Sequence, residues 1–487
     1  MKQPLILALD IGTSSVRAAL YDSDAKPLRG GSVKIEHSLH VTADGGSEID
    51  ADEAFAQVVA AIDAVLEKTS KLDRPIGFVA ASSFWHSLVG IDADGRPTTK
   101  VLGWADTRSR KYTDILRKRF DETETHNRTG ARFHSSFWPA KLSWIRKEWP
   151  EAFTKTERWL SLCDYIALKL FGEAVTSVSM ASGTGIFDQR NCTWDTELFR
   201  YLELGPSQLP RITAADSETF SLINKYAKRW PRLADARWFP SVADGAADNI
   251  GAGCTTKTRA TLMVGTSGAM RVAYEGEPPD KIPPGLWCYR VDRKRVLLGG
   301  ALSDGGGLYH WLKQTLKLPP DAEAEIAKRP PGTEGLTFLP FLAGERSTGY
   351  HESAKGAVVG LRTATTSIDI LQSAFESVAF RFAEVFDQLR SVVKVKEIVA
   401  SGGALRESPV WTQIIADVLG HDLTMNIAHE SSSRGAVLLA LESIGKIDTI
   451  DAPFGMFSDS VKANRTRNEQ YHLARKKNRD IYDRLIK

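Results

Sequence analysis

The first residues that could do chemistry lie at the end of an apolar run. Residues 5–9 are apolar, Asp10 follows directly, and the small residues Gly12, Thr13, Ser14 and Ser15 come next. Residues 16–21 form a second β-prone run, so we expect a hairpin with 12–15 at its tip. Backbone N–H groups and hydroxyls at such a tip can surround phosphate oxygens, and a carboxylate beside them can bind a metal ion. An ordinary hairpin with a surface aspartate would fit this stretch equally well.

The same tripeptide recurs about half a chain later. Gly265, Thr266 and Ser267 follow an apolar run and precede a second strand-like run that carries an arginine. Repetition at this distance predicts two similar halves that face one cleft. Met263 stands in the second copy where Asp10 stands in the first. We therefore expect one half to supply a carboxylate and the other to supply neutral donors only.

A third glycine-rich stretch lies near the C-terminus. Residues 397–400 are typical of a strand, which ends at Gly402 and Gly403, and Ser408 opens a segment with apolar residues at helical spacing. A strand, a glycine pair and a helix start would form a flat backbone shelf for a nucleotide. A lone glycine pair is more often a simple turn.

Two longer segments are typical of the scaffold that must hold these loops. Asp50 has the character of an N-cap for an amphipathic helix, and residues 368–389 predict another, with Glu376 and Arg381 outside its apolar stripe. The 487 residues are too many for one core, so two domains are expected.

The composition excludes several classes of partner. The net charge is only +3 and the basic residues are dispersed, which argues against nucleic acid. The four cysteines show no Cys-x-x-Cys spacing, and no stretch reaches the ~18 apolar residues of a membrane span. We therefore expect a cytoplasmic protein without a membrane partner, zinc site or disulfide framework.

Taken together, residues 10–17, 265–268 and 401–404 resemble the FGGY carbohydrate kinases in their order and spacing. The resemblance extends from about Pro4 to about Gly445. It implies an α/β fold with two ribonuclease-H-like domains of the actin, hexokinase and Hsp70 type, which flank a nucleotide and sugar cleft. We place an N-terminal sugar-binding and catalytic domain at 1–250 and a C-terminal nucleotide-binding domain at 251–487.

The resemblance also implies the cofactors, ATP and Mg²⁺. Asp10 would be the metal ligand, directly or through water, because Mg²⁺ takes one or two carboxylates together with nucleotide phosphates. The residues expected to bind ATP are Gly12, Thr13, Ser14, Ser15, Arg17, Gly265, Thr266, Ser267, Gly402 and Gly403.

The catalytic base is placed by the segment 239–251, which resembles the family's base-carrying loop. Asp244 is the candidate, since a sugar hydroxyl needs an acceptor for its proton as phosphorus is attacked. Asp248 is a rival four residues on, and either aspartate could instead cap a helix.

The sugar site is expected from two further stretches. Trp104, Asp106 and Arg108 match a family pattern that offers an apolar face, a hydroxyl acceptor and a bidentate donor. His86 follows a predicted strand where relatives place a sugar-contacting histidine, so we assign it to substrate with the other three and Asp244. Alone, the first pattern would more often be an exposed loop, and a histidine beside aromatic residues would more often serve packing.

Within the family the resemblance is strongest to the gluconate kinases. It rests on His86-Ser-Leu, on 181–188 with the following Trp194, and on 340–346. Xylulokinases more often have Met-His-Gly at the first of these, and the string that names the family is not preserved. We therefore predict transfer of phosphate from ATP to D-gluconate, giving 6-phosphogluconate.

A substrate carboxylate needs a cation at the end of the site away from Asp244. Arg108 is the first candidate, together with Arg132 or Lys141, although Lys141 could equally be a solvated residue on a helix surface.

Other functions stay open at this level. The acceptor could be a neutral ketose or polyol such as xylulose, ribulose or glycerol. An actin-like or Hsp70-like ATPase would lack the Trp104–Arg108 pattern and Asp244, and a sugar-sensing pseudoenzyme is disfavoured by intact Asp10 and Asp244. The partner is thus a small sugar or sugar acid, and a homodimer is compatible with the sequence.

Overall fold

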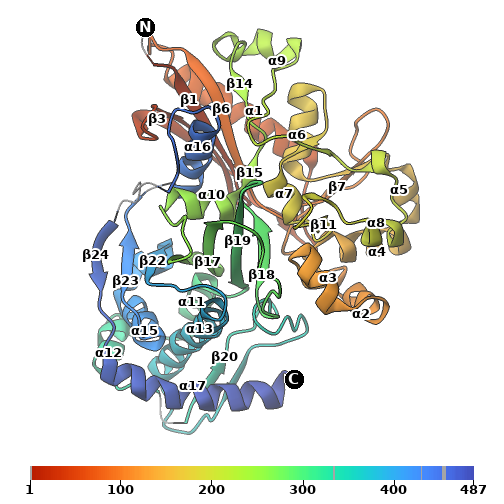
Figure 1. Ribbon diagram of the computed structural model, residues 1–487. Coiled ribbons are helices and arrows are strands. Elements are labelled where there is room, and N and C mark those ends of the chain that lie inside the picture. The colour runs from red at the N-terminus through yellow and green to blue at the C-terminus, as the bar shows by residue number, and fades with distance from the viewer. Residues whose placement is uncertain (1–2, 333–334, 429, 452–456) are drawn as a thin grey trace.

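The computed structural model describes residues 3–332, 335–428, 430–451 and 457–487, and two mixed sheets organise it (Figure 1). In the first sheet, β1 pairs with the antiparallel β2 on one side and with the parallel β6 on the other. Its strands, in spatial order, are β14 (Arg237–Trp238), β6 (Ile76–Ser83), β1 (Leu5–Ile11), β2 (Ser15–Tyr21) and β3 (Pro27–Glu36), with β15 (Val242–Ala243) also beside β6.

The second sheet repeats this arrangement. Its strand β16 pairs with the antiparallel β17 on one side and with the parallel β22 on the other. The predicted hairpins and the predicted repeat of the two halves are therefore confirmed. The strands, in spatial order, are β18 (Trp287–Arg290), β19 (Arg295–Leu302), β17 (Gly268–Glu275), β16 (Arg259–Val264), β22 (Glu397–Ser401), β23 (Leu423–Asn426) and β24 (Phe457–Val461).

The alternation of side chains along β1 decides which way Asp10 points. Leu5, Leu7 and Leu9 pack into one cluster with helix α1 (Ala51–Lys68), whose N-cap is Asp50 as expected. Ile6 and Ala8 pack into another cluster, on the opposite face of the sheet. Because successive residues of a strand face opposite sides, Asp10 belongs to this second face.

Two helices on this second face are exchanged between the halves. Helix α16 (Ser431–Ser443) packs against β1 and β6 of the first sheet, whereas α10 (Asp244–Gly251) contacts β17 of the second sheet and also β6 and β15 of the first (Figure 1). The two helices cross in backbone contact. A Cβ atom on Gly435 would lie 1.8 Å from the carbonyl oxygen of Ala247, and one on Gly251 would lie 1.9 Å from that of Ser431.

The exchange bears on the division of the chain into domains. The first sheet uses strands up to residue 243 and the second begins at residue 259. Helix α16 belongs to the second half of the sequence but covers the first sheet. We keep a division near residue 251 as a proposal for the sheets, with α16 covering the first sheet and α10 in contact with both.

The remaining elements of the first half form a mostly helical region beside its sheet (Figure 1). The helices are α2 (Arg110–Arg119), α3 (Glu122–Thr129), α4 (Trp138–Glu148), α5 (Pro150–Lys155), α6 (Leu162–Phe171), α7 (Val178–Ser182), α8 (Thr196–Tyr201), α9 (Asn224–Arg229), η1 (Pro206–Gln208) and η2 (Pro231–Leu233). The short strands are β4 (His40–Val41), β5 (Ser47–Ile49), β7 (Val89–Ile91), β8 (Val101–Leu102), β9 (Arg158–Leu160), β10 (Val175–Thr176), β11 (Phe187–Asp188), β12 (Thr193–Trp194) and β13 (Arg211–Ile212).

The second half adds helices around its own sheet. They are α11 (Gly306–Thr315), α12 (Ala322–Lys328), α13 (Ser367–Arg390), α14 (Gly403–Glu407), α15 (Pro409–Leu419) and α17 (Arg465–Leu485), with the hairpin β20 (Thr337–Leu339) and β21 (Ala357–Val359). None of the helices in the described part of the chain is apolar over a membrane-spanning length.

Helix α13 differs from the simple amphipathic helix predicted for 368–389. Glu376 and Arg381, expected outside the apolar stripe, are only 3 % and 2 % exposed. Arg381 donates to Glu345 and pairs with Glu384, and Glu376 accepts from the backbone of Gly332. These partners compensate for the loss of hydration that burial of charge requires.

Candidate active site

The first phosphate hairpin has the geometry predicted from its sequence. The N–H of Gly12 donates to the carbonyl oxygen of Ser15 at 3.0 Å, which closes a tight tip between β1 and β2. Thr13 is partly exposed and Ser14 is exposed, so their donors are accessible, whereas Ser15 is the first residue of β2 and is 1 % exposed. Of the predicted contacts at this tip, Thr13 and Ser14 have the accessible side chains.

Asp10 lies at the base of this hairpin, at matching positions of three strands. It is opposite Arg17 of β2 and Ser82 of β6. The hydroxyl of Ser82 donates to its Oδ1 at 2.8 Å, and Arg17 donates to its Oδ2 at 3.1 Å. Burial raises the pKa of Asp10, while these two hydrogen bonds oppose the shift. Arg17 also pairs with Glu430 at 3.3 Å, just before α16.

The donor set around Asp10 fits a magnesium ion that is shared with a nucleotide. Within the described ranges, no group of three or more His, Cys, Asp or Glu side chains could hold a metal ion. A single carboxylate suits Mg²⁺, because this ion keeps several waters and takes further oxygen ligands from nucleotide phosphates. Asp10 would hold the ion, which would neutralise phosphate charge during transfer.

The second hairpin has a tip that is one residue shorter than the first, and it has additional support. The N–H of Gly265 donates to the carbonyl oxygen of Ser267 at 2.9 Å, and Thr266 is exposed. The N–H groups of Gly306 and Gly307 donate to the carbonyl oxygens of Gly265 and Thr266, so the start of α11 holds the loop in place. This support was not predicted, although three consecutive glycines at 305–307 after an apolar run are a signal for it.

The C-terminal glycine pair forms a bend between β22 and α14. Gly402 has a φ of 105°, and a Cβ there would lie 2.2 Å from the carbonyl oxygen of Val264. A Cβ on Gly403 would meet no heavy atom within 4 Å. Backbone therefore borders open space at Gly403, as a nucleotide shelf requires, and the assignment of both glycines to ATP stays a prediction.

The two candidate bases have different surroundings on the same helix. Asp244 is the first residue of α10 and has no ion-pair partner among the described residues, while Asp248 pairs with Arg271 at 3.2 Å. Burial raises the pKa of Asp244 to about 7, and the charge of Arg271 opposes this shift. The charge of Asp10 raises it further, so these two carboxylates lie in one electrostatic neighbourhood. A carboxylate with a pKa near neutrality suits a general base.

The loop with the Trp-x-Asp-x-Arg pattern is held by its own charges. Asp106 is 1 % exposed, and its oxygens accept from Arg108 and from the backbone of Ser47. Arg108 also pairs with Glu48 at 2.5 Å. Trp104 is partly exposed. Asp106 and Arg108 thus shape the loop in this structure, and their contact with substrate stays a prediction.

His86 faces the same region in a strained backbone conformation. Its φ is 69°, and its Nδ1 lies 2.5 Å from the carbonyl oxygen of Gly183. Burial lowers its pKa well below the usual value, so the ring is neutral. With Nδ1 as the donor to that carbonyl, Nε2 is left as an acceptor for a hydroxyl. Positive φ in a residue other than glycine is often found at functional sites.

Lys141 is not the surface residue that the sequence allowed. It is fully buried in α4, and its ammonium donates to the carbonyl oxygens of His86, Gly103 and Ser136 at 2.7, 2.8 and 2.9 Å. All three of its donors are therefore used. It connects three loops of the expected sugar site and has no proton left for a substrate carboxylate.

Arg346 is a cationic residue that the sequence analysis did not assign. Its guanidinium lies over the ring of Trp104, 5.3 Å from the ring centroid. Among the described residues it has no hydrogen-bond or ion-pair partner, whereas Arg132 pairs with Glu122. Burial lowers the pKa of Arg346, and the charge of Asp244 opposes the shift. The sequence includes it in the stretch 340–346, but nothing there indicates that its donors are free.

The two repeated sheets, the two glycine-rich hairpins and a carboxylate at a helix start are the arrangement that a two-domain phosphotransferase needs. A comparison of the sequence with protein-family models identifies the family within that class. The N-terminal domain model of the FGGY family of carbohydrate kinases matches residues 5–233, and the C-terminal domain model matches 260–443. The chain belongs to this family and is a carbohydrate kinase.

The relatives of this chain are named for different sugar substrates. The chain is 27% identical over 472 residues to a gluconokinase of Bacillus subtilis, covering 94% of this chain and 91% of the relative. It is 24% identical over 440 residues to a xylulose kinase of Staphylococcus xylosus, covering 89% and 90%.

The solved structures similar to this chain also include both gluconate and xylulose kinases. A gluconate kinase from Lactobacillus acidophilus matches with a TM-score of 0.90 and 28% identity, covering 99% of this chain and 98% of the other. A ligand-bound xylulose kinase from the same organism matches with the same TM-score, identity and coverage. The family and the fold are thus shown, and the sugar is left to the chemistry of the site.

Proposed function

We propose that this kinase transfers the γ-phosphoryl group of ATP to the terminal hydroxyl of D-gluconate and forms 6-phosphogluconate. Asp244 accepts the proton of that hydroxyl as oxygen attacks phosphorus. The two Gly-Thr-Ser hairpins hold phosphate oxygens through their backbone donors. His86 accepts from a substrate hydroxyl through Nε2, and Asp10 holds the Mg²⁺ that accompanies ATP.

The single observation that carries the choice of a sugar acid is the guanidinium of Arg346, which has no hydrogen-bond or ion-pair partner in the described part of the chain. The three cations expected to hold a carboxylate are already engaged, Arg108 with Asp106 and Glu48, Arg132 with Glu122, and Lys141 with three carbonyl oxygens. Arg346 lies over Trp104 without such a partner. A carboxylate from the substrate would satisfy it, and the gluconokinase names among the relatives point the same way.

A screen of substrate-dependent ADP release tests this function. The acceptors are gluconate, xylulose, ribulose, glycerol and erythritol, each with wild type and with Asp244→Asn. We expect the highest kcat/KM for gluconate, with ³¹P NMR showing a phosphate monoester on its terminal carbon. Loss of a general base typically costs ~10²- to 10⁴-fold, so Asp244→Asn should fall by that factor.

Two results would contradict the proposal at different levels. A higher kcat/KM for xylulose or glycerol would replace gluconate with a neutral acceptor and leave the kinase chemistry intact. Full activity of Asp244→Asn with gluconate would remove Asp244 from its role as base.

A further inference from the structure

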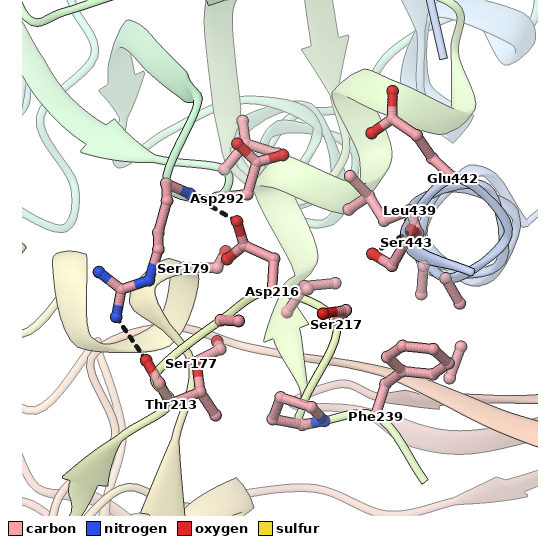
Figure 2. A pocket seen from close by; sticks show the side chains of 18 of the residues that line it. Ser177, Ser179, Thr213, Asp216, Ser217, Phe239, Asp292, Leu439, Glu442 and Ser443 are labelled. Atoms are coloured by element: carbon pink, nitrogen blue, oxygen red, sulfur yellow. Dashed lines mark hydrogen bonds between the residues drawn. The ribbon is translucent and has the colours of Figure 1, made fainter. Parts of the chain in front are cut away.

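The segment that leads into α10 borders open volume on one side. Its strand β15 includes Val242, which lines a cavity of about 430 Å³ between the two halves (Figure 2). Beside the cavity, the N–H of Ala243 donates to the hydroxyl of Ser179 at 3.1 Å. Packed side chains do not surround this segment, so the first turn of α10, which begins at Asp244, needs support from other elements.

Arg271 of β17 lies beside this first turn. A Cβ on Gly245, the residue after Asp244, would lie 3.4 Å from both Cζ and Nε of Arg271. On the neighbouring strand β19, Gly299 is paired with Arg271, and a Cβ there would lie 3.1 Å from its Cγ. Glycine at both positions therefore leaves room for the arginine side chain. The side chain is buried between the strand and the helix, since Arg271 is only 8 % exposed.

Asp248 fixes the guanidinium at this place. Its Oδ2 accepts a hydrogen bond from Nη1 of Arg271 at 3.2 Å. Residues four apart lie on the same face of a helix, so Asp244 and Asp248 both face the arginine. Nε of Arg271 is buried and has no hydrogen-bond partner among the described residues. Arg271 thus has one donor engaged with Asp248 and another that lies on the side of Gly245 and Asp244.

The carboxylate of Asp244 needs a nearby positive charge. Its Oδ1 accepts from the N–H of Gly245 at 2.6 Å, and burial by itself favours the protonated form, which cannot accept a proton. Four charged groups act on it from the elements packed around it: Arg271 of β17, Asp10 of β1, Asp248 of α10 and Arg346 of the loop after β20. Asp10 and Asp248 add to the effect of burial, and Arg271 is the strongest group that opposes it.

We propose that Arg271 and Asp248 are positioning residues for the base: Asp248 holds the guanidinium beside the first turn of α10, and Arg271 keeps the carboxylate of Asp244 ionised. This inference rests on the assignment of Asp244 as the base in the proposed function. It gives Asp248, the rival base, a role that needs no proton transfer. The ion pair also joins α10 to the second sheet, so both halves of the chain position the base.

The opposite charges of the two positioning residues predict opposite shifts of the pH profile. Arg271→Gln removes a positive charge, so the pKa of Asp244 rises and the pH at which kcat/KM is half of its maximum rises with it. An arginine beside an aspartate typically lowers the pKa by about 1–3 units, and we expect a rise of about one unit. Asp248→Asn removes a negative charge and releases the guanidinium, so its midpoint should fall. Arg271→Lys keeps the charge and should restore most of the shift.

The profiles are recorded with gluconate and with xylulose, because the base acts on either acceptor. Arg259→Gln is the matched control, since it removes from the neighbouring strand β16 an arginine that pairs with Glu397 at 2.7 Å. This control should keep the wild-type midpoint. Asp248→Asn is nearly isosteric, so it tests the inference even where Arg271→Gln does not fold.

Unchanged midpoints in Arg271→Gln and Asp248→Asn, or shifts of the same sign, would overturn the inference. A higher KM for ATP in Arg271→Gln with an unchanged midpoint would also overturn it, because Arg271 would then act on the phosphates. Asp244→Asn separates this inference from the proposed function. Its full activity would remove the base itself, whereas its loss of activity together with unshifted midpoints would remove only the role of Arg271 and Asp248.

Discussion

The crossing of α10 and α16 gives the sharpest structural prediction. In Gly435→Ala, the new Cβ would lie 1.8 Å from the carbonyl oxygen of Ala247, where 3.4 Å or more is ordinary contact. The obstacle is helix backbone, which cannot rotate away. The two helices must therefore separate by roughly 1.5 Å before the methyl group fits.

Both stability and catalysis should respond. Overpacking of this kind costs about 1–3 kcal/mol of unfolding free energy. Ala247 is three residues from Asp244 on the same helix, so a shift of α10 moves the base as well. Misplacement by ~1 Å can cost about 10²-fold in rate. We expect kcat to fall roughly 100-fold in a protein that still folds.

Urea unfolding and steady-state ADP release with gluconate measure the two effects. Gly205→Ala is the matched control, because its Cβ would lie 3.7 Å from the nearest atom, the end of the Gln208 side chain. This control should keep wild-type stability and kcat. A Gly435→Ala enzyme with the stability and kcat of the wild type would refute the close crossing of the helices and its role in positioning Asp244.

The other predictions concern single residues of the site. Gly403→Val should keep its fold, because its Cβ meets no atom within 4 Å, and should weaken ATP binding in calorimetry; unchanged ATP affinity would remove Gly403 from the nucleotide site. Burial raises the pKa of Asp244 to about 7, and the base must be ionised to accept a proton. We therefore expect kcat/KM to fall as the pH drops through about 7. A kcat/KM independent of pH between 5 and 8 would contradict the assignment of Asp244 as the base. Lys141→Met leaves three loop carbonyl groups without their donor, so we expect a higher KM for the sugar and a free energy of unfolding that is ~1–3 kcal/mol lower. An unchanged KM and an unchanged free energy of unfolding would show that the three loops keep their positions without Lys141.

The local parts of the fold were predictable from sequence because their signals are local. An apolar run followed by Gly-Thr-Ser and a second β-prone run predicts a hairpin at residue 12 and again at residue 265, and both are present. The N-cap at Asp50 follows from side-chain chemistry in the same way. The exchange of α10 and α16 was not predictable, because Gly251 and Gly435 show their purpose only when the two helices are placed together.

The charged residues of the site show where sequence reasoning stops. Residue type alone does not show which of Arg108, Lys141 and Arg346 would bind a carboxylate, because all three carry a cationic side chain. The ammonium group of Lys141 donates to carbonyl oxygens of three separate loops, and Arg108 pairs with Asp106 of its own loop and with Glu48 of β5. Arg346 has no such partner among the described residues. Which cation is free depends on long-range contacts that spacing along the chain does not encode.

A comparison of gluconate with D-gluconamide, which has the same chain and hydroxyls without the charge, tests whether Arg346 binds the substrate carboxylate. We predict that wild-type kcat/KM is at least about tenfold higher for gluconate, since a charge-assisted hydrogen bond contributes about 1.5–3 kcal/mol. The preference should disappear in Arg346→Gln through a higher KM for gluconate alone. Equal wild-type kcat/KM for the acid and the amide would show that no cation of the site binds the substrate carboxylate.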